Sequence, residues 1–152
     1  MIDGVVVAVP ENVVKNDDKF GKGTGVHSRR VSVDHSILDL AEEASDYLLL
    51  RMELEPHQIN NLVFVTQTPL LRMPATACML ADRLGFSGPA LDVNLACSGY
   101  VYGLWLASRL PGRTLLVAGD VTSKYTSESD PSTRNIFGDA VSATLVSPYR
   151  TA

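Results

Sequence analysis

The amino-acid sequence predicts an α/β domain built around a mixed sheet of five strands. Short runs rich in β-branched residues alternate with longer segments of helical periodicity, which is typical of a parallel sheet covered by helices. The last two apolar runs follow one another with no helical segment between them. The predicted order is strand, helix, strand, helix, strand, helix, strand, strand, and the final strand is expected to pair antiparallel to its predecessor.

The first predicted strand and the segment after it differ in composition. Residues 4–9 are a valine-rich run closed by Pro10, so we expect a strand that is buried on both faces. Residues 11–35 are polar, and we expect an irregular segment there. The first helix is therefore expected only after residue 35.

A capping signal and helical spacing mark that helix. Ser36 followed by Asp39 resembles a capping box, and apolar residues recur behind it at helical spacing. We expect a helix over residues 36–53, which Pro56 prevents from continuing. The apolar run at residues 61–68 then predicts a second buried strand.

The second half of the chain continues the alternation with shorter elements. Pro74 at the first helical position and Gly85 just past the end bound one predicted helix, because proline and glycine are favoured at those places. The polar loop at residues 120–135 is longer than typical connections, which indicates a functional role. The other predicted elements are strands at 90–95, 113–119 and 139–146 and a helix at 98–109.

The predicted helix at residues 98–109 is apolar around its whole circumference until Arg109. Such a helix is expected to be a central one, buried on every side. The remaining elements are too few to cover it, so we expect the cover to come from a partner subunit or from a second half of a larger protein. The end of the chain, directly after a predicted buried strand, indicates the same.

Composition and charge exclude several classes of protein. A chain of 152 residues with 45% hydrophobic content is expected to form a single domain, residues 1–152, with a substantial core. The net charge of −4 argues against a nucleic-acid partner. Two cysteines without a CxxC pair, together with three scattered histidines, predict a reduced intracellular protein that has neither a disulfide scaffold nor a metal site.

The apolar run near the N-terminus is short and lacks a preceding basic region. Asp3 and Glu11 flank it, so it is predicted to be neither a signal peptide nor a membrane span. We therefore expect a cytoplasmic protein without a membrane partner.

Cys97 stands where a predicted strand gives way to the apolar helix. Free backbone N–H groups and the helix dipole favour a thiolate at such a junction, and the small neighbours Ala96, Ser98 and Gly99 leave room for a substrate. The arrangement resembles a nucleophile elbow with sulfur in place of oxygen. The alternative is a buried, inert cysteine, which is how we interpret Cys78 on the second helix.

Four segments carry motifs that occur in the same order in one family of enzymes. Residues 92–104, DVNLACSGYVYGL, contain the pattern Asp-Val-x-x-Ala-Cys-x-Gly-aromatic, and residues 23–29, GTGVHSR, contain Thr-Gly-aliphatic-x-x-Arg. Residues 73–85, MPATACMLADRLG, and 119–140, GDVTSKYTSESDPSTRNIFGDA, extend the match over nearly the whole chain. Together they resemble the β-ketoacyl-acyl-carrier-protein synthase III family, and the combination is more specific than any single motif.

The resemblance implies the amino-terminal half of a thiolase-like fold, in which two similar βαβαβαββ halves stack into five layers and usually form a homodimer. Central helices of the two halves lie against each other, which would explain the apolar helix. In such enzymes the cysteine takes an acyl group from a coenzyme A or acyl-carrier-protein thioester, with no covalently bound cofactor. Decarboxylation of malonyl-carrier protein then gives a carbanion that attacks the new thioester, as in fatty acid or polyketide synthesis. Cys97 maps onto the nucleophile.

The catalytic His and Asn of that family lie in the carboxy-terminal half, which this chain does not contain. His27, His35 and His57 stand in loop-like or capping contexts, and we expect them to be solvated surface residues. The chain is therefore expected to have a nucleophile without the apparatus for decarboxylation.

Four further positions match family residues around the substrate. Met73 aligns with an aromatic residue that lines the partner's acyl pocket across the dimer, and ordinary packing of a methionine is the alternative. Arg134 matches a position near the coenzyme A entrance, and an exposed turn arginine is the alternative. Phe137 and Gly138 match a Phe-Gly-Asp motif that shapes the site.

The nucleotide end of the donor is where the sequence departs from the family. Gly23 replaces an arginine that often precedes Thr-Gly-Ile, and the tryptophan that stacks on adenine has no counterpart before it. Arg29, with Lys22 and Arg30, can still meet phosphates, and a solvated basic turn is the alternative. An acyl-carrier protein is therefore as reasonable a donor as coenzyme A.

Three functions remain open on these grounds. The first is the amino-terminal domain of a 3-oxoacyl-acyl-carrier-protein synthase III-like condensing enzyme with Cys97 as its nucleophile. The second is an acyltransferase that uses the same thiol without condensation. The third is a non-catalytic module that binds a carrier protein or a second subunit, with an incidental thiol.

Overall fold

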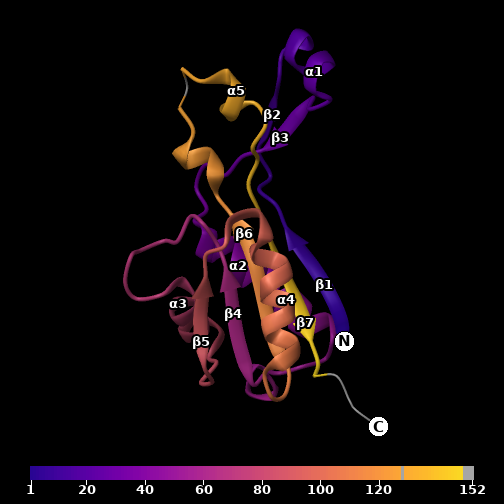
Figure 1. Ribbon diagram of the computed structural model, residues 1–152, viewed down its shortest axis with the longest axis vertical. Helices are drawn as coiled ribbons and strands as arrows, with labels where there is room; N and C mark the ends of the chain where they lie inside the picture. The colour runs from indigo at the N-terminus through magenta and orange to yellow at the C-terminus, as the bar shows by residue number, and fades with distance from the viewer. Residues whose placement is uncertain (128, 149–152) are drawn as a thin grey trace.

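The computed structural model describes residues 1–127 and 129–148, so residue 128 of the predicted loop and the last four residues lie outside the described part. One mixed sheet of five strands in the order β1-β7-β6-β4-β5 organises the molecule (Figure 1). The neighbouring strands β6, β4 and β5 are parallel to one another, whereas β7 is antiparallel to β6. This arrangement confirms the predicted topology. The strands are β1 (Ile2–Ala8), β4 (Asn61–Val65), β5 (Ala90–Val93), β6 (Thr114–Asp120) and β7 (Ala140–Val146).

Helices cover the two faces of this sheet unequally. The helices α2 (Ile37–Arg51) and α3 (Thr76–Leu84) pack on one face, and α4 (Gly99–Arg109) packs alone on the other (Figure 1). Each face of the sheet has its own apolar core. Alternate residues of β4 pack into one core or the other, because side chains alternate along a strand. Phe64 belongs to the α2 and α3 side, whereas Val63 belongs to the α4 side.

The helix α2 begins as its sequence predicts. The Ser36 hydroxyl accepts a hydrogen bond from the Asp39 N–H at 3.3 Å, and the Asp39 carboxylate accepts one from the Ser36 N–H at 2.7 Å. Arg83 of α3 also donates to Asp39 at 2.7 Å and thereby ties the two helices together. Burial raises the pKa of Asp39, but the hydrogen bonds from Arg83 and Ser36 outweigh this effect and lower it to about 2.

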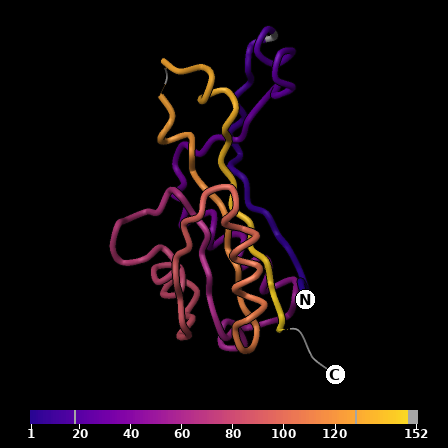
Figure 2. The backbone as a smooth tube through the Cα atoms, viewed as in Figure 1, coloured from indigo at the N-terminus to yellow at the C-terminus, as the bar shows by residue number. Residues whose placement is uncertain are grey.

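The segment expected to be irregular, residues 11–35, contains regular structure. It holds β2 (Val13–Lys15), α1 (Asp18–Thr24) and β3 (Ser28–Arg30), and β2 and β3 pair antiparallel in a sheet of their own. Residues 131–137, with the one-turn helix α5 (Pro131–Arg134), lie beside them. We call residues 13–30 and 131–138 the small lobe, which projects beyond one end of the main sheet (Figure 2). Short three-residue strands carry too little periodicity to be predicted from sequence.

The remaining described elements are short 3₁₀ turns. They are η1 (Pro56–Gln58), η2 (Ala96–Ser98) and η3 (Thr122–Tyr125), the last of which lies within the predicted polar loop. In the described part of the chain, no helix has the length and apolar character needed to cross a membrane.

The strand β1 is not buried on both faces, contrary to the expectation from its valine-rich sequence. It is an edge strand that pairs only with β7. Val6 and Ala8 face α2, whereas Val5 and Val7 are 51% and 57% exposed. The physical reason is that α4 lies over β4 and β6 and does not reach this edge of the sheet.

The helix α4 is likewise buried on one side only within this chain. Gly99 and Gly103 face the sheet, and a Cβ on either glycine would lie within 3.0 Å of the Val65 side chain, so glycine permits the close approach. On the opposite side, Val101, Tyr102 and Trp105 are exposed, with Trp105 at 59%. Nothing in the described part of the chain covers that side, as expected from the small number of remaining elements, and burial by a partner subunit or a second half stays a prediction.

Candidate active site

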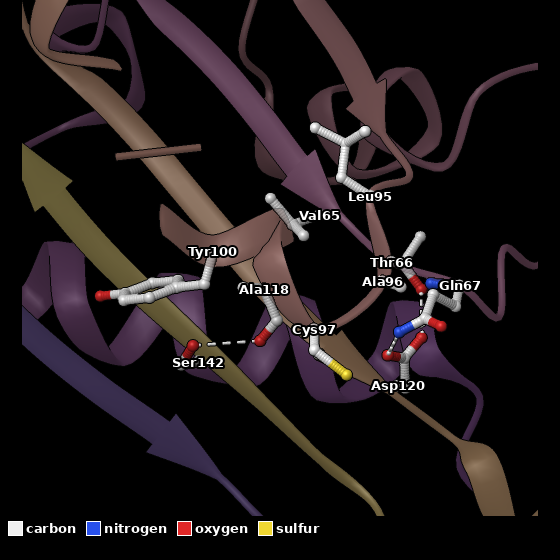
Figure 3. A pocket seen from close by; sticks show the side chains of 11 residues that line it. Val65, Thr66, Gln67, Leu95, Ala96, Cys97, Tyr100, Ala118, Asp120 and Ser142 are labelled. Carbon is white, nitrogen blue, oxygen red and sulfur yellow. Dashed lines mark hydrogen bonds between the residues drawn. The ribbon is translucent and has the colours of Figure 1, made fainter. Parts of the chain in front are cut away.

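A cavity of about 340 Å³ opens at the edge of the sheet where the parallel strands β4 and β6 end. The carboxyl ends of parallel strands are where α/β proteins place their ligands. The sulfur of Cys97 lies at this cavity and is directed towards the side lined by Asp120 and Gln67 (Figure 3). The lining residues are Val65, Thr66, Gln67, Leu95, Ala96, Cys97, Tyr100, Ala118, Gly119, Asp120 and Ser142.

The backbone before Cys97 makes a sharp turn out of the sheet. Ala96 has a φ of +47°, a left-handed conformation that costs a residue with a Cβ about 1–2 kcal/mol. This turn ends β5 and leads through η2 into α4, so Cys97 stands two residues before the helix. Backbone strain of this kind is concentrated at functional sites.

Cys97 is exposed, and the alternative of a buried, inert cysteine does not describe it. It lies two residues before the first residue of α4, where the backbone N–H groups of a helix N-terminus have no partner within the helix. The position at the junction and the access to a cavity are as the sequence predicts. The chemical role of the sulfur stays a prediction at this point.

Polar residues of α4 and of the sheet also line the cavity. The Tyr100 hydroxyl lies 3.1 Å from the Thr144 hydroxyl, and the Ser142 hydroxyl donates to the Ala118 carbonyl oxygen at 3.0 Å. Asp120, at the end of β6, accepts hydrogen bonds from the segment that follows β4. Sequence reasoning missed Asp120, although an acidic residue at the carboxyl end of a predicted parallel strand was a usable signal.

Arg29 is buried and holds parts of the small lobe together by hydrogen bonds. Its guanidinium donates to the Arg134 carbonyl oxygen at 2.6 Å and to the Phe137 carbonyl oxygen at 3.3 Å. Its Nε donates to the Asn16 side-chain oxygen at 3.2 Å. A solvated basic turn, the alternative given for Arg29, is therefore wrong for this residue, although Lys22 beside it is exposed.

The structure brings four of the sequence-predicted site residues together in the small lobe. Arg29 contacts the backbone of Arg134 and Phe137, and a Cβ on Gly138 would lie 3.0 Å from the Arg30 carbonyl oxygen. None of these residues lines the cavity at Cys97. They form a second group in the small lobe, which lies at the same end of the sheet as the start of α4 (Figure 1).

Met73 and Cys78 are both exposed, and of the two only Cys78 departs from expectation. Met73 is 84% exposed on the loop between β4 and α3, next to the exposed Leu70 and Leu71, so ordinary packing within this chain does not account for it. Cys78 is exposed on α3 and is not the small core residue that was expected. Its sulfur lies 3.8 Å from the Ala90 carbonyl oxygen and does not line the cavity.

The histidines are surface residues, as expected. His27, His35 and His57 are exposed, and none lines the cavity at Cys97. Over residues 1–127 and 129–148, no group of three His, Cys, Asp or Glu side chains is arranged to hold a metal ion.

Comparison with known sequences identifies relatives of this chain. The family model of 3-oxoacyl-[acyl-carrier-protein (ACP)] synthase III matches residues 91–152. A putative 3-oxoacyl-[acyl-carrier-protein] synthase 3 of Campylobacter jejuni is 34% identical over 95% of this chain and 47% of its own length. A β-ketoacyl-[acyl-carrier-protein] synthase III of Nitratidesulfovibrio vulgaris is 38% identical over 90% of this chain and 44% of its own length. The chain thus spans about half the length of the curated relatives it matches.

Solved structures give the same result for the fold. A 3-oxoacyl-(acyl-carrier protein) synthase from Burkholderia xenovorans matches with a TM-score of 0.92 and 36% identity, over 99% of this chain and 48% of that chain. A priming β-ketosynthase of the R1128 polyketide pathway, at 24% identity, matches with a TM-score of 0.90 and supports the fold alone. These likenesses confirm the predicted fold class, one half of a thiolase-like fold.

Proposed function

Because the chain belongs to the 3-oxoacyl-[acyl-carrier-protein] synthase III family and spans about half a relative's length, we propose that it is the amino-terminal domain of a condensing enzyme. Cys97 is then the residue that accepts the acyl group. The single observation that supports this most directly is the exposed sulfur at a cavity, placed by a strained turn at the start of α4.

The first step is acyl transfer to the sulfur. The Cys97 thiolate attacks the carbonyl carbon of an acyl thioester, and a new carbon–sulfur bond forms. The carbon–sulfur bond to coenzyme A or to the carrier protein then breaks, and the departing thiolate takes up the proton that Cys97 released. No metal or resident cofactor enters this step.

The second step joins two carbon chains. Malonyl-carrier protein loses carbon dioxide, and the resulting carbanion attacks the Cys97 thioester, which forms the carbon–carbon bond and releases Cys97. The family resemblance assigns this step to a His and an Asn outside the present chain. We therefore propose that this domain by itself can accept the acyl group and that condensation requires the other half.

The uncovered side of α4 supports the placement of that half. Val101, Tyr102 and Trp105 on α4, together with Val5 and Val7 on β1, leave a broad apolar surface on one face of the sheet. Exposed apolar patches of this kind mark interfaces. We propose that the carboxy-terminal half covers this surface.

A second copy of the protein is the expected partner at the loop between β4 and α3. Leu70, Leu71 and Met73 stand exposed there, and Met73 is the residue expected to line the acyl pocket of the partner. A flexible thioether at that place would give a deformable pocket floor. The homodimer and the cytoplasmic location both stay predictions.

The small lobe is the proposed path of the acyl donor. It lies at the same end of the main sheet as the start of α4 (Figure 1). It holds Arg134, Phe137 and Gly138, and Arg29 donates hydrogen bonds to the carbonyl oxygens of Arg134 and Phe137. Because the Arg29 guanidinium is buried among carbonyl oxygens, we propose that it shapes this path and does not contact phosphate directly. Coenzyme A and acyl-carrier protein both remain candidate donors.

The test is acylation of the intact protein followed by mass spectrometry. Incubation with acyl-coenzyme A or acyl-carrier protein is expected to add one acyl group to Cys97, and Cys97→Ala is expected to remove the adduct. Cys78→Ala is the matched control, because Cys78 is also exposed but does not line the cavity. Acylation that persists in Cys97→Ala, or no adduct with either donor, contradicts the proposal.

Addition of malonyl-carrier protein to the acylated domain, in the presence of a separately produced carboxy-terminal half, separates the enzymatic alternatives. Formation of a 3-oxoacyl product supports the condensing enzyme. A stable acyl adduct that passes only to another carrier or small acceptor supports the transferase. A protein that binds the carrier protein without acylation supports the binding module.

A further inference from the structure

Asp120 joins the ends of two parallel strands beside Cys97. Its Oδ1 accepts hydrogen bonds from the Thr66 hydroxyl at 2.9 Å, the Gln67 N–H at 2.7 Å and the Thr68 N–H at 2.9 Å. The Thr68 hydroxyl adds a fourth bond to the same oxygen at 3.0 Å. Hydrogen bonds to an ionised acceptor are about twice as strong as those between neutral groups. One carboxylate oxygen therefore fixes three successive residues.

The backbone directly after Asp120 also bonds to the segment that follows β4. The Thr68 hydroxyl accepts a hydrogen bond from the Val121 N–H at 3.0 Å, and the Thr68 N–H also approaches the Thr66 hydroxyl at 3.0 Å. Thr66 and Thr68 are buried, whereas Gln67 between them is exposed at the cavity. The result is a closed set of bonds between the end of β6 and the segment after β4.

The second carboxylate oxygen of Asp120 is held much less tightly than the first. In the part of the chain that the structure describes, Oδ2 receives only a long contact of 3.5 Å from the Gln67 side-chain amide. Asp120 and Gln67 line the cavity together with Cys97 (Figure 3). The anchored oxygen thus holds a wall of the cavity, and the same segment leads directly into the loop with Met73.

We propose that Asp120 is a positioning residue for acyl transfer at Cys97, because it holds the segment 66–68, of which Thr66 and Gln67 line the cavity beside Cys97. This inference rests on the acyl transfer proposed above. It assigns Asp120 no contact with the reacting atoms. Its role is to keep the bound acyl donor in a geometry from which the sulfur can attack.

The test compares two reactions of the same sulfur in the intact protein. Asp120→Ala is expected to lower the rate constant of Cys97 acylation at saturating donor at least about tenfold, because misplacement remote from the chemistry can cost up to about 100-fold. Alkylation of Cys97 by iodoacetamide, which needs no cavity wall, is expected to stay within about twofold of wild type. A merely structural role would not separate the two rates.

Asp120→Asn distinguishes positioning from a role of the charge. The asparagine side-chain oxygen can still accept the bonds that Oδ1 accepts, so acylation is expected to stay within about threefold of wild type. Thr68→Val, which loses one donor from the same set, is expected to lower acylation less than Asp120→Ala, and Thr68→Ser is expected to restore it.

Asp92→Ala is the matched control for general destabilisation. The Asp92 carboxylate also accepts two backbone N–H bonds, from Thr76 at 2.8 Å and from Ala77 at 2.7 Å, but it does not line the cavity. Its loss is expected to lower stability while acylation per folded molecule stays within about twofold.

The outcomes are decisive in both directions. If the wild-type protein is acylated and Asp120→Ala is acylated at the same rate, this inference is overturned and the proposed function is not. Equal losses in Asp120→Ala and Asp92→Ala, or equal losses of acylation and alkylation, also overturn it. If Asp120→Asn lowers the acylation rate as much as Asp120→Ala does, positioning through hydrogen bonds is overturned and the charge of Asp120 is what matters. Absence of acylation in the wild-type protein is a failure of the proposed function itself.

Discussion

The two faces of the main sheet are built for different tasks. On one face α2 and α3 bury a continuous apolar core in which Leu40, Phe64 and Leu80 are fully buried. On the other face α4 covers only part of the sheet, and its outer side exposes Val101 and Trp105. The first face closes the domain by itself, whereas the second face carries Cys97 and remains open to a further layer.

This difference explains how one short chain can hold both a buried core and a cavity on a face that its own helices cover only in part. The covered face provides most of the buried apolar area, which is the main favourable contribution to folding. The open face brings the cavity, the strained Ala96 turn and the start of α4 to one edge. Stability and function are therefore separable by substitution.

The largest expected difference between the faces is in the free energy of unfolding. Phe64→Ala on the covered face is expected to cost about 3–5 kcal/mol, because it removes a large fully buried side chain and leaves a cavity. Trp105→Ala on the open face is expected to change the stability of this chain by about 0.5 kcal/mol or less. Denaturant unfolding measures both values, and comparable losses would show that the open side of α4 is already packed in the chain alone.

The same tryptophan is expected to matter once the other half is present. Trp105→Ala should weaken association with a separately produced carboxy-terminal half by about 2 kcal/mol or more, as for a large aromatic residue near the centre of an interface. Titration calorimetry measures the dissociation constant, and Tyr47→Ala serves as the control, because Tyr47 is about half exposed on α2 of the covered face. Equal affinities of the wild type and Trp105→Ala would place the interface elsewhere.

The turn before Cys97 gives a smaller effect on the open face. Ala96→Gly should raise the free energy of unfolding by about 1 kcal/mol, because glycine adopts a positive φ without steric cost. Ala96→Val should lower it by about 1–2 kcal/mol, because a bulky β-branched residue fits that region poorly. Denaturant unfolding of the two variants tests this ordering, and a stabilising Ala96→Val would show that the turn is not strained.

Features that depend on neighbouring residues in the chain could be predicted from the sequence, and features that depend on distant contacts could not. The helix α2 and the strand β4 were predicted because their own residues carry the capping box and the apolar run. The small lobe was not, because β2 and β3 are held by contacts such as the bond between Arg29 and the Arg134 carbonyl oxygen, over a hundred residues away along the chain. Cys97 has a local motif, whereas the importance of Asp120 depends on the pairing of β4 with β6.

The smallest predicted effect concerns acid stability on the covered face. Hydrogen bonds from Arg83 and Ser36 outweigh burial and lower the pKa of Asp39 from 3.8 to about 2. Because the folded-state pKa lies below the unfolded value, the stabilisation is present above pH 3.8 and is lost as the pH falls towards about 2. Asp39→Asn should therefore be less stable than wild type at neutral pH, and the difference should shrink over that window.

The partner of Asp39 tests the sign of this dependence. Arg83→Met removes a hydrogen bond and a positive charge from Asp39, so the pKa of Asp39 should rise and the acid loss of stability should begin at higher pH. The ion pair is more than a third exposed, so solvent and salt weaken it and the shift should be modest. Thermal unfolding as a function of pH measures it, and an unchanged profile in Arg83→Met would assign the low pKa of Asp39 to the Ser36 cap alone.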